Sequence, residues 1–370
     1  MPARHTLPFY IGGFLGPFGG GVVAVLVPQL RDAFDASTAG VAATIPAYLV
    51  PFALLQLVSG TIGERLGRRR VVLTAYIVYA LLSLAAAFAP NLEVFIGIRA
   101  LQGSANAFLT PLLLAGLADL VPPRQIGRAI GTFAAVQTAA VALAPLGGGA
   151  LGAIDWRLAF LSQTVVALAL ACFPPPDPEQ RGDTPRLRAV FTRRVGLLSG
   201  AAFAGYAGVT GIGFLVAVEA ADEFGLGSIA RGVLLAGFGV AGMLVGRAAG
   251  DAVDRFGRTP VSLAGIAICA VLVTALGIAP SAVALGALWF AVGLGSALVW
   301  AGINVLAVEA VPGNRAGGTS VVSAFKFAGN AAAPLMWLPL YHADPRLGFL
   351  GAGILAAVAG LFIAPLRMAR

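Results

Sequence analysis

Gly60-Thr-Ile-Gly-Glu-Arg-Leu-Gly-Arg-Arg-Arg70 is a charged turn between two long apolar runs. A second copy, Gly250-Asp-Ala-Val-Asp-Arg-Phe-Gly-Arg258, repeats its spacing of Gly, three residues, acid, Arg, one residue, Gly, Arg at an offset of 190. That offset is about half of the 370-residue chain. The sequence therefore reads as two versions of one unit.

The composition is that of an integral membrane protein. Hydrophobic residues make up 59% of the chain and charged residues 11%, and the mean hydropathy is +0.91, which excludes an ordinary soluble domain. The net charge of +8 comes from arginines in short turns between apolar runs, where they set membrane orientation, so we expect no nucleic-acid partner. The apolar run after Thr6 is too long for a signal peptide and is expected to remain as the first helix.

Charged and Pro/Gly breaks divide the chain into twelve segments near the roughly 20 apolar residues that a spanning helix needs. The predicted spans are 8–30, 40–62, 71–89, 94–119, 128–150, 157–173, 195–218, 230–249, 259–279, 282–309, 316–340 and 348–366. The predicted fold is therefore all-α, with a six-helix bundle over 1–173, another over 195–370, and a polar, proline-rich cytoplasmic linker over 174–194.

The arginines predict the orientation. With the N-terminus inside, eighteen arginines lie on the cytoplasmic side and only four outside, namely Arg31, Arg157, Arg231 and Arg346. Both termini are therefore expected in the cytoplasm, with the protein in the cell (plasma) membrane.

The repeat extends beyond the turn. Asp119-Leu-Val-Pro122 is matched by Glu309-Ala-Val-Pro312 at an offset of 190, and Asp155-Trp-Arg157 by Asp344-Pro-Arg346 at an offset of 189. Six helices separate the copies, so each keeps its membrane orientation, which indicates two parallel, pseudo-symmetric halves.

These features resemble the major facilitator superfamily over nearly the whole chain. Arg99-Ala-Leu-Gln102-Gly103 is similar to a motif of its drug/proton antiporter branch, whereas Ala144-Pro-Leu-Gly-Gly148 lacks the first glycine and one spacer of that branch's next motif. Glu64 stands where the family usually has Asp. The resemblance implies a secondary transporter working by alternating access, with proton-coupled export of a drug or metabolite. It also implies a conformational latch, formed by Gly60, Glu64, Arg65, Gly67, Arg68, Gly250, Asp254, Arg255, Gly257 and Arg258.

Physical chemistry gives the latch a mechanism. Gly60 and Gly63 remove bulk where spans 40–62 and 316–340 could approach. Glu64 is expected at the N-terminus of span 316–340, where the helix dipole favours a carboxylate, and Asp254 at the N-terminus of span 128–150. The competing interpretation is that the arginines serve only orientation.

Polar residues inside the spans are the candidates for substrate binding and coupling. Arg99, Gln102, Asn106 and Thr110 are spaced as one helical stripe, and so are Thr319, Ser323, Lys326 and Asn330, which predicts a polar-walled cavity. Gln137 and Lys326 each precede a proline by eight residues. The candidate set is Arg99, Gln102, Asn106, Gln137, Asn304, Lys326 and Asn330.

Two cations within spans leave two functional interpretations open. Lys326, the chain's single lysine, either is held structurally by carbonyls or Asn330, or faces a central cavity where it meets an anion or exchanges a proton. Arg99 either binds substrate or joins the fourth span to the first. Since no acid falls in the middle of a predicted span, the alternative to drug export is transport of an organic or inorganic anion by Arg99 and Lys326.

Other classes of protein are less favoured. The sequence has no nucleotide loop, metal-ligand spacing or nucleophile triad, so we expect no enzyme, cofactor or metal site, and a non-transporting receptor is the distant alternative. Cys172 and Cys269 are interpreted as buried small hydrophobes. The expected partners are a small-molecule substrate, the lipid bilayer and protons as candidate coupling ions, and the expected state is a monomer.

Overall fold

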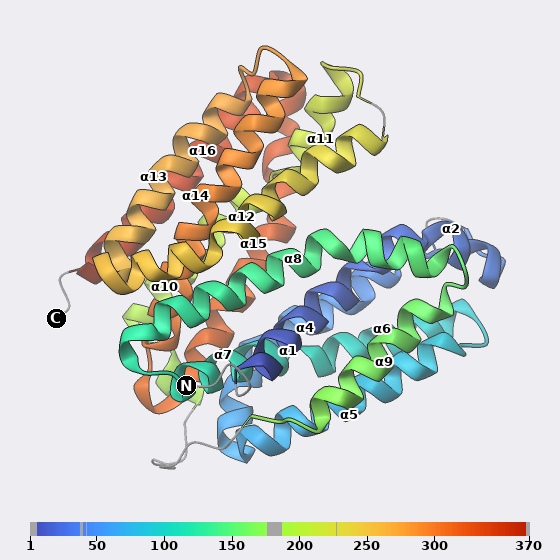
Figure 1. Cartoon of the computed structure of the whole chain (residues 1–370). Helices are drawn as coiled ribbons and strands as arrows, with labels where there is room; N and C mark the ends of the chain where they lie inside the picture. The colour runs from blue at the N-terminus through green and yellow to red at the C-terminus, as the bar shows by residue number, and fades with distance from the viewer. Residues whose placement is uncertain (1–5, 38–39, 42, 176–186, 227, 368–370) are drawn as a thin grey trace. The chain divides into compact units, whose positions relative to one another are not determined.

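The computed structural model describes residues 6–37, 40–41, 43–175, 187–226 and 228–367, and over these residues the chain is helical with no strand (Figure 1). Residues 176–186 of the predicted linker and both chain ends lie outside the described residues. The linker and the location of the termini therefore stay predictions.

The first half of the chain forms six helical spans. They are α1 (Leu7–Gly21) with α2 (Val23–Phe34), α4 (Thr44–Leu66), α5 (Arg68–Ala87), α6 (Leu92–Asn106) with α7 (Leu109–Leu120), α8 (Ile126–Gly152) and α9 (Arg157–Ala171). The pair α1 and α2 is bent by 48°, close to the Gly-rich stretch that ends α1. Glycines and prolines are common causes of such kinks.

The second half forms the corresponding six spans. They are α10 (Arg193–Gly205) with η4 (Tyr206–Thr210) and α11 (Gly213–Asp222), α12 (Ser228–Phe256), α13 (Arg258–Leu276), α14 (Ala282–Val308), α15 (Arg315–Ala343) and α16 (Pro345–Ile363). Short 3-10 turns over Pro123–Gln125, Leu187–Val190, Pro312–Asn314 and Ala364–Arg367 complete the described elements. The five residues of η4 form a π-helical turn, which the sequence did not predict.

Nine helices within the described residues are long and apolar enough to cross a bilayer, and the bent pair α1–α2 makes a tenth. α9 is apolar but shorter, and α15 carries the polar stripe around Lys326, which lowers its mean hydropathy. Together the described helices supply the twelve spans that the sequence predicts. Many large apolar side chains are exposed on the protein surface, among them Leu54 (63%), Val283 (83%) and Leu335 (80%), as a lipid-facing surface requires.

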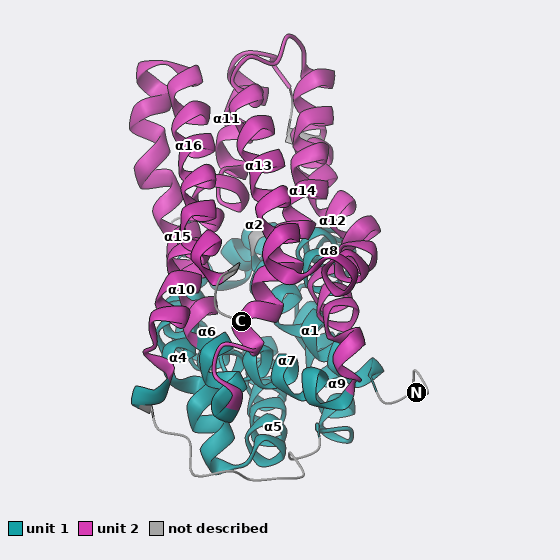
Figure 2. Ribbon diagram, turned by 90° about the vertical axis from the view of Figure 1, so that its left-hand side faces the viewer, with its two compact units in different colours: residues 1–120, 136–189, 313–320 teal, residues 121–135, 190–312, 321–370 magenta. Residues whose placement is uncertain are grey.

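The described helices pack into two compact units (Figure 2). Unit 1 contains residues 1–120, 136–189 and 313–320, and unit 2 contains residues 121–135, 190–312 and 321–370. The start of α8 therefore packs with unit 2, and the start of α15 packs with unit 1. The predicted division into bundles over 1–173 and 195–370 remains a prediction.

The packing inside each unit follows the sequence repeat. In unit 1, α5 packs against α6 and α9, and α4 against α6; in unit 2, α13 packs against α14 and α16, and α12 against α14. The repeated aspartates also have one structural role. Asp155 accepts a hydrogen bond from the Arg157 amide (2.9 Å) at the start of α9, and Asp344 accepts one from the Arg346 amide (2.8 Å) at the start of α16.

Candidate functional site

The first copy of the charged turn is closed by a buried arginine. Gly67 has φ 98°, a conformation that favours glycine, and it turns the chain from α4 into α5. This turn places Arg68, which is 3% exposed, between two carboxylates: its guanidinium donates to Glu64 at 2.7 Å and to Asp119 at 2.9 Å. Asp119 also accepts a hydrogen bond from Arg315, the first residue of α15.

The start of α15 is held against α4 by small and neutral residues. A side chain at Gly60 would collide with the Ala316 carbonyl, and the Gly60 amide donates to the Ser320 hydroxyl at 3.2 Å. Asn314 donates to Thr61 at 2.8 Å and accepts from the Gly317 amide at 3.0 Å. The predicted approach of α15 to Gly60 is therefore confirmed.

Two details of that prediction are wrong. Glu64 does not contact the N-terminus of α15, because the turn at Gly67 places Arg68 beside its carboxylate and the two side chains form an ion pair. Gly63 does not face α15 either, because a side chain there would meet Leu112 of α7. The α15 end is instead held by uncharged hydrogen bonds and by the Asp119–Arg315 pair.

The second copy uses its acid differently. Gly257 has φ 93° and turns α12 into α13, and Arg258 pairs with Glu309, as Arg68 pairs with Asp119. Asp254 is not the partner of Arg258, and its carboxylate accepts hydrogen bonds from the Gly127 amide (2.8 Å) and the Arg128 amide (2.9 Å). Both amides lie at the beginning of α8, so the predicted contact of Asp254 with this helix end is confirmed.

Glycines make the crossing of α8 and α12 close. An ideal Cβ at Gly131 would lie 2.5 Å from the Gly246 carbonyl oxygen and 2.9 Å from Gly250 Cα. An ideal Cβ at Gly127 would lie 2.8 Å from the Gly250 carbonyl oxygen. Real Cβ atoms do not approach so closely, so each helix presents two glycines four residues apart to let the backbones touch.

Arg65 and Arg255, the arginines next to the acids of the two turns, make fewer contacts than Arg68 and Arg258. Arg65 is exposed and makes no ion pair with the described residues, and Arg255 is exposed with its guanidinium 5.2 Å from the Phe256 ring centroid. Six residues of the predicted latch make the contacts described above, namely Gly60, Glu64, Arg68, Gly250, Asp254 and Arg258. Gly67 and Gly257 form the two turns.

Arg99 lies in a closed network inside unit 1. Its side chain is fully buried, donates to Gln102 and to the Gly19 carbonyl (3.2 Å), and lies 4.2 Å from the Tyr48 ring centroid. Gln102 donates onward to Ser83 at 2.7 Å. The network joins α1, α4, α5 and α6, which is the structural interpretation of Arg99.

The first three residues of the polar stripe predicted on the fourth span are buried in this structure. Arg99 and Gln102 are 0% exposed and Asn106 is 3% exposed, because Gly16 and Gly19 let α1 cover them. At the end of the stripe, Thr110 and Gln137 form a hydrogen bond of 3.4 Å. Thr110 and Gln137 are partly exposed, so the polar-walled cavity stays a prediction.

Lys326 lies in an aromatic cage inside unit 2. Its ammonium is 5.2 Å from the ring centroids of both Tyr206 and Trp300, and 3.5 Å from the Asn304 Oδ1. Its exposed fraction is 8%. No carboxylate contacts the ammonium among the described residues.

The cage has a recognisable local construction. Trp300 and Asn304 are four residues apart on α14, so both face α15. Tyr206 begins the π-helical turn, and its ring lies 4.4 Å from that of Trp300, centroid to centroid. Asn330 is exposed one turn beyond Lys326, and the side-chain hydrogen bond of the ammonium goes to Asn304 and not to Asn330. The structure thus brings together Lys326 and Asn304 of the predicted set.

Sequence reasoning missed Tyr206 and Trp300, since aromatic residues in an apolar span read as core. The i, i+4 spacing of Trp300 and Asn304 was the sequence signal that could have found Trp300. The π-helical turn that positions Tyr206 has no such signal in the sequence. Sequence reasoning was also wrong about Cys172, which is exposed at the end of α9, whereas Cys269 is buried as expected. Among the described residues, no His, Cys, Asp and Glu side chains cluster as a metal site would require.

Comparison with known proteins agrees with this architecture. The sequence profile of the Major Facilitator Superfamily matches residues 9–250 and 197–370. The multidrug efflux pump LfrA of Mycolicibacterium smegmatis is 34% identical over 167 residues, covering 44% of this chain and 33% of that protein. The tetracenomycin C resistance and export protein of Streptomyces glaucescens is 28% identical over 169 residues, covering 45% and 31%. The chain thus spans about a third of the length of these relatives.

Two solved structures share the fold along nearly their whole length. The proton:xylose symporter XylE bound to 6-bromo-6-deoxy-D-glucose has a TM-score of 0.81 at 15% identity, over 97% of this chain and 94% of XylE. The human organic anion transporter MFSD10 has a TM-score of 0.81 at 16% identity, over 98% and 100%. Repeated charged turns, twelve helical spans and a profile match over both halves have one explanation: the chain is a multi-pass membrane protein that belongs to the Major Facilitator Superfamily.

Proposed function

We propose that this chain exports small organic anions across the cell membrane by alternating access, and that Lys326 meets the substrate's negative charge. The observation that carries the proposal is the aromatic cage around Lys326, in which no described carboxylate contacts the ammonium. A charge inside a membrane span is costly without a partner, and cation–π contacts offset about 0.5–2 kcal/mol of that cost. An anion is the partner that this cage lacks.

The cage also favours an organic substrate. The rings of Tyr206 and Trp300 provide apolar and aromatic surface next to the ammonium, which suits a carboxylate or phenolate attached to a flat apolar body. Asn304 adds an amide that can hydrogen-bond the same group. We assign Arg99 and Gln102 a positioning role, because their network ties together the helices of unit 1.

Alternating access needs contacts that form in one state and break in the other. The crossings of α4 with α15 and of α8 with α12 join segments of the two predicted bundles, 1–173 and 195–370. We propose that these two crossings are the latch, that they lie on the cytoplasmic side where both termini lie, and that they separate when substrate enters from the cytoplasm.

Relatives support export. One is named as a multidrug efflux pump, and another as a resistance and export protein. The fold is shared with a proton:xylose symporter and with an organic anion transporter. We extend export, proton coupling and organic anions to this chain as parts of the proposal, together with a monomeric state and the plasma membrane.

Proton-coupled export of neutral or cationic drugs is the second candidate, favoured by the antiporter-like Arg99-Ala-Leu-Gln102-Gly103 and by the named relatives. The two candidates differ in what Lys326 does. In the first it contacts the substrate, and in the second it carries a proton or is structural.

Flux in proteoliposomes separates the candidates. We expect aromatic carboxylates to be transported by the native protein and by Lys326→Arg, and to be transported at least about tenfold more slowly by Lys326→Ala, because a desolvated charge partner is worth 1.4 kcal/mol or more. Lipophilic cations transported equally by native protein and Lys326→Ala would overturn the anion proposal. Binding of ligands without any flux would indicate a receptor instead.

A further inference from the structure

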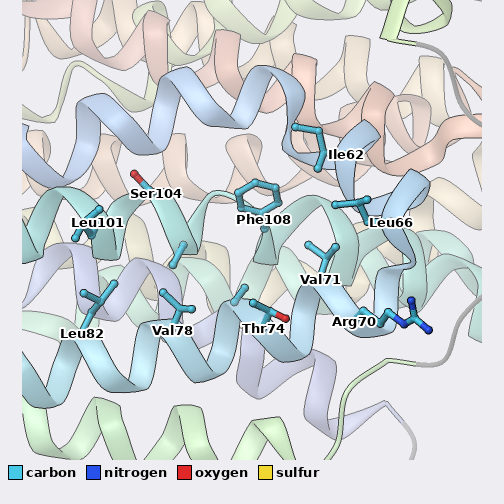
Figure 3. A pocket seen from close by; sticks show the side chains of 12 residues that line it. Ile62, Leu66, Arg70, Val71, Thr74, Val78, Leu82, Leu101, Ser104 and Phe108 are labelled. Atoms are coloured by element: carbon cyan, nitrogen blue, oxygen red, sulfur yellow. The ribbon is translucent and has the colours of Figure 1, made fainter.

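A lipid-facing pocket of about 550 Å³ lies in unit 1, between α4, α5 and the α6–α7 pair (Figure 3). Its lining is apolar over most of its length, and several lining side chains are exposed on the protein surface, including Leu66 (62%) and Leu101 (58%). Because these helices span the bilayer, apolar groups exposed on them face acyl chains. The pocket therefore opens toward the acyl chains of the membrane.

One end of this pocket is basic. Figure 3 shows Arg70 at one end of the groove and Leu82 and Leu101 at the other. Arg70 is exposed in the first turn of α5 and makes no hydrogen bond or ion pair with the described residues. The buried Arg68, two residues earlier, is by contrast occupied by Glu64 and Asp119. Arg70 is free to take an anion at the membrane surface.

The dimensions fit one leaflet. Arg70 and Leu82 are twelve residues apart on one helix, so the groove extends about 18 Å along α5 at 1.5 Å per residue. The hydrocarbon core of a bilayer is about 30 Å thick, so one leaflet is about 15 Å deep. A lipid with its headgroup at Arg70 would lay one acyl chain along the groove.

The sequence repeat provides an internal comparison. A second pocket of about 410 Å³ lies between α12, α13 and α14, and six of its lining residues are equivalent to residues of the first at the offset of 190. Val78 corresponds to Ile268, for example, and Ser104 to Leu294. At the position equivalent to Arg70 the second half has Pro260. The groove thus belongs to the repeated fold, and the cation belongs to the first half alone.

We propose that the pocket between α4, α5 and α6–α7 is a binding site for an anionic phospholipid, whose acyl chain fills the groove and whose phosphate pairs with Arg70. Arginine suits this role because its planar donors recognise phosphate oxygens in pairs. The orientation predicted from the arginines places Arg70 at the cytoplasmic leaflet, where anionic lipids are enriched. The proposal does not depend on the transported substrate.

Native mass spectrometry of the purified protein, incubated with equal amounts of phosphatidylglycerol and phosphatidylcholine, tests the site. One arginine near an anionic headgroup predicts a preference of about fivefold for phosphatidylglycerol in the first bound lipid. Arg70→Gln is expected to remove this preference. Arg193→Gln, which neutralises another exposed arginine, in the first turn of α10, is expected to keep it.

Filling the groove gives a second readout. Val78→Trp is expected to abolish binding of the first lipid, whereas Ile268→Trp at the equivalent place in the second pocket is expected to leave it unchanged. Should Val78→Trp fail to fold, Ser104→Phe blocks the same groove. An unchanged preference in Arg70→Gln, equal lipid retention in the two tryptophan variants, or a bound adduct whose mass is not that of a lipid would each overturn the proposal.

Discussion

Asp254→Ala is expected to loosen the start of α8 from the end of α12. Asp254 accepts from the Gly127 amide at 2.8 Å and from the Arg128 amide at 2.9 Å, and the alanine has no acceptor for either. Loss of a helix cap costs about 0.5–2 kcal/mol, and loss of a charge near a helix N-terminus costs about 0.3–1 kcal/mol. Since Asp254 is exposed, we take the lower part of these ranges, about 1 kcal/mol in total.

A change of about 1 kcal/mol shifts a two-state equilibrium about fivefold. Asp254→Asn keeps an amide oxygen as acceptor and loses the charge, so its effect should fall between those of the native protein and Asp254→Ala. Glu64→Ala, by comparison, removes a partner of Arg68 and no contact to α15, so we expect it to change this equilibrium less.

Maleimide labelling of Ala135→Cys measures the separation directly. Ala135 on α8 is 9% exposed and lies directly against Gly246 on α12, because a Cβ built at Gly246 would lie 2.4 Å from the Ala135 Cβ. A thiol at position 135 is therefore expected to react only when the two helices separate. Asp254→Ala should raise its labelling rate about fivefold. The native Cys172 is exposed and serves as the control in the same sample. An unchanged rate at position 135, or an equal rise at Cys172, would refute the reasoning.

Two further predictions concern stability. Gly131→Ala places a Cβ 2.5 Å from the Gly246 carbonyl oxygen, so the helices must part, and the free energy of unfolding should fall by about 1–3 kcal/mol, as for an overpacked core. Gly232→Ala on α12 meets nothing within 4 Å and should be neutral or stabilising. Arg68→Gln leaves Glu64 without its cation and Asp119 with Arg315 alone. Because Asp119 is 31% exposed and keeps Arg315, we expect the free energy of unfolding to fall by about 1–3 kcal/mol, less than the full cost of breaking a buried pair. Thermal unfolding of each variant beside the native protein tests both, and a Gly131→Ala protein as stable as Gly232→Ala would contradict the first.

The repeat made much of the fold predictable. Spans, turns and the approach of Gly60 to α15 follow from apolar periodicity and from an offset that places equivalent residues at equivalent depths. The Asp254 contact was predictable for the same reason, because an acid at the end of one helix and two amides at the start of another are complementary in any membrane protein of this topology.

What escaped prediction depended on competition between neighbours. Glu64 had two possible partners, the N-terminus of α15 and Arg68, and it pairs with Arg68, which the turn at Gly67 brings back to the end of α4. Arg99 could either face a cavity or donate to a backbone carbonyl. Because the glycines of α1 allow a close approach, Arg99 donates to the Gly19 carbonyl at 3.2 Å. Such choices depend on interhelical distances of an ångström or two, which a single sequence does not encode in any pattern.

The two turns therefore share one design but fix their helix ends by different forces. At α15 the contacts are short, buried and uncharged, as between Asn314 and Thr61, with the charges of Asp119 and Arg315 at the edge. At α8 an exposed carboxylate acts on a helix dipole, an interaction that salt screens. If both crossings must part in one transport cycle, the α8 crossing has the weaker electrostatic hold in physiological salt and should open first. The different partners of Glu64 and Asp254 thus give the proposed latch a direction, in which the second copy is expected to separate before the first.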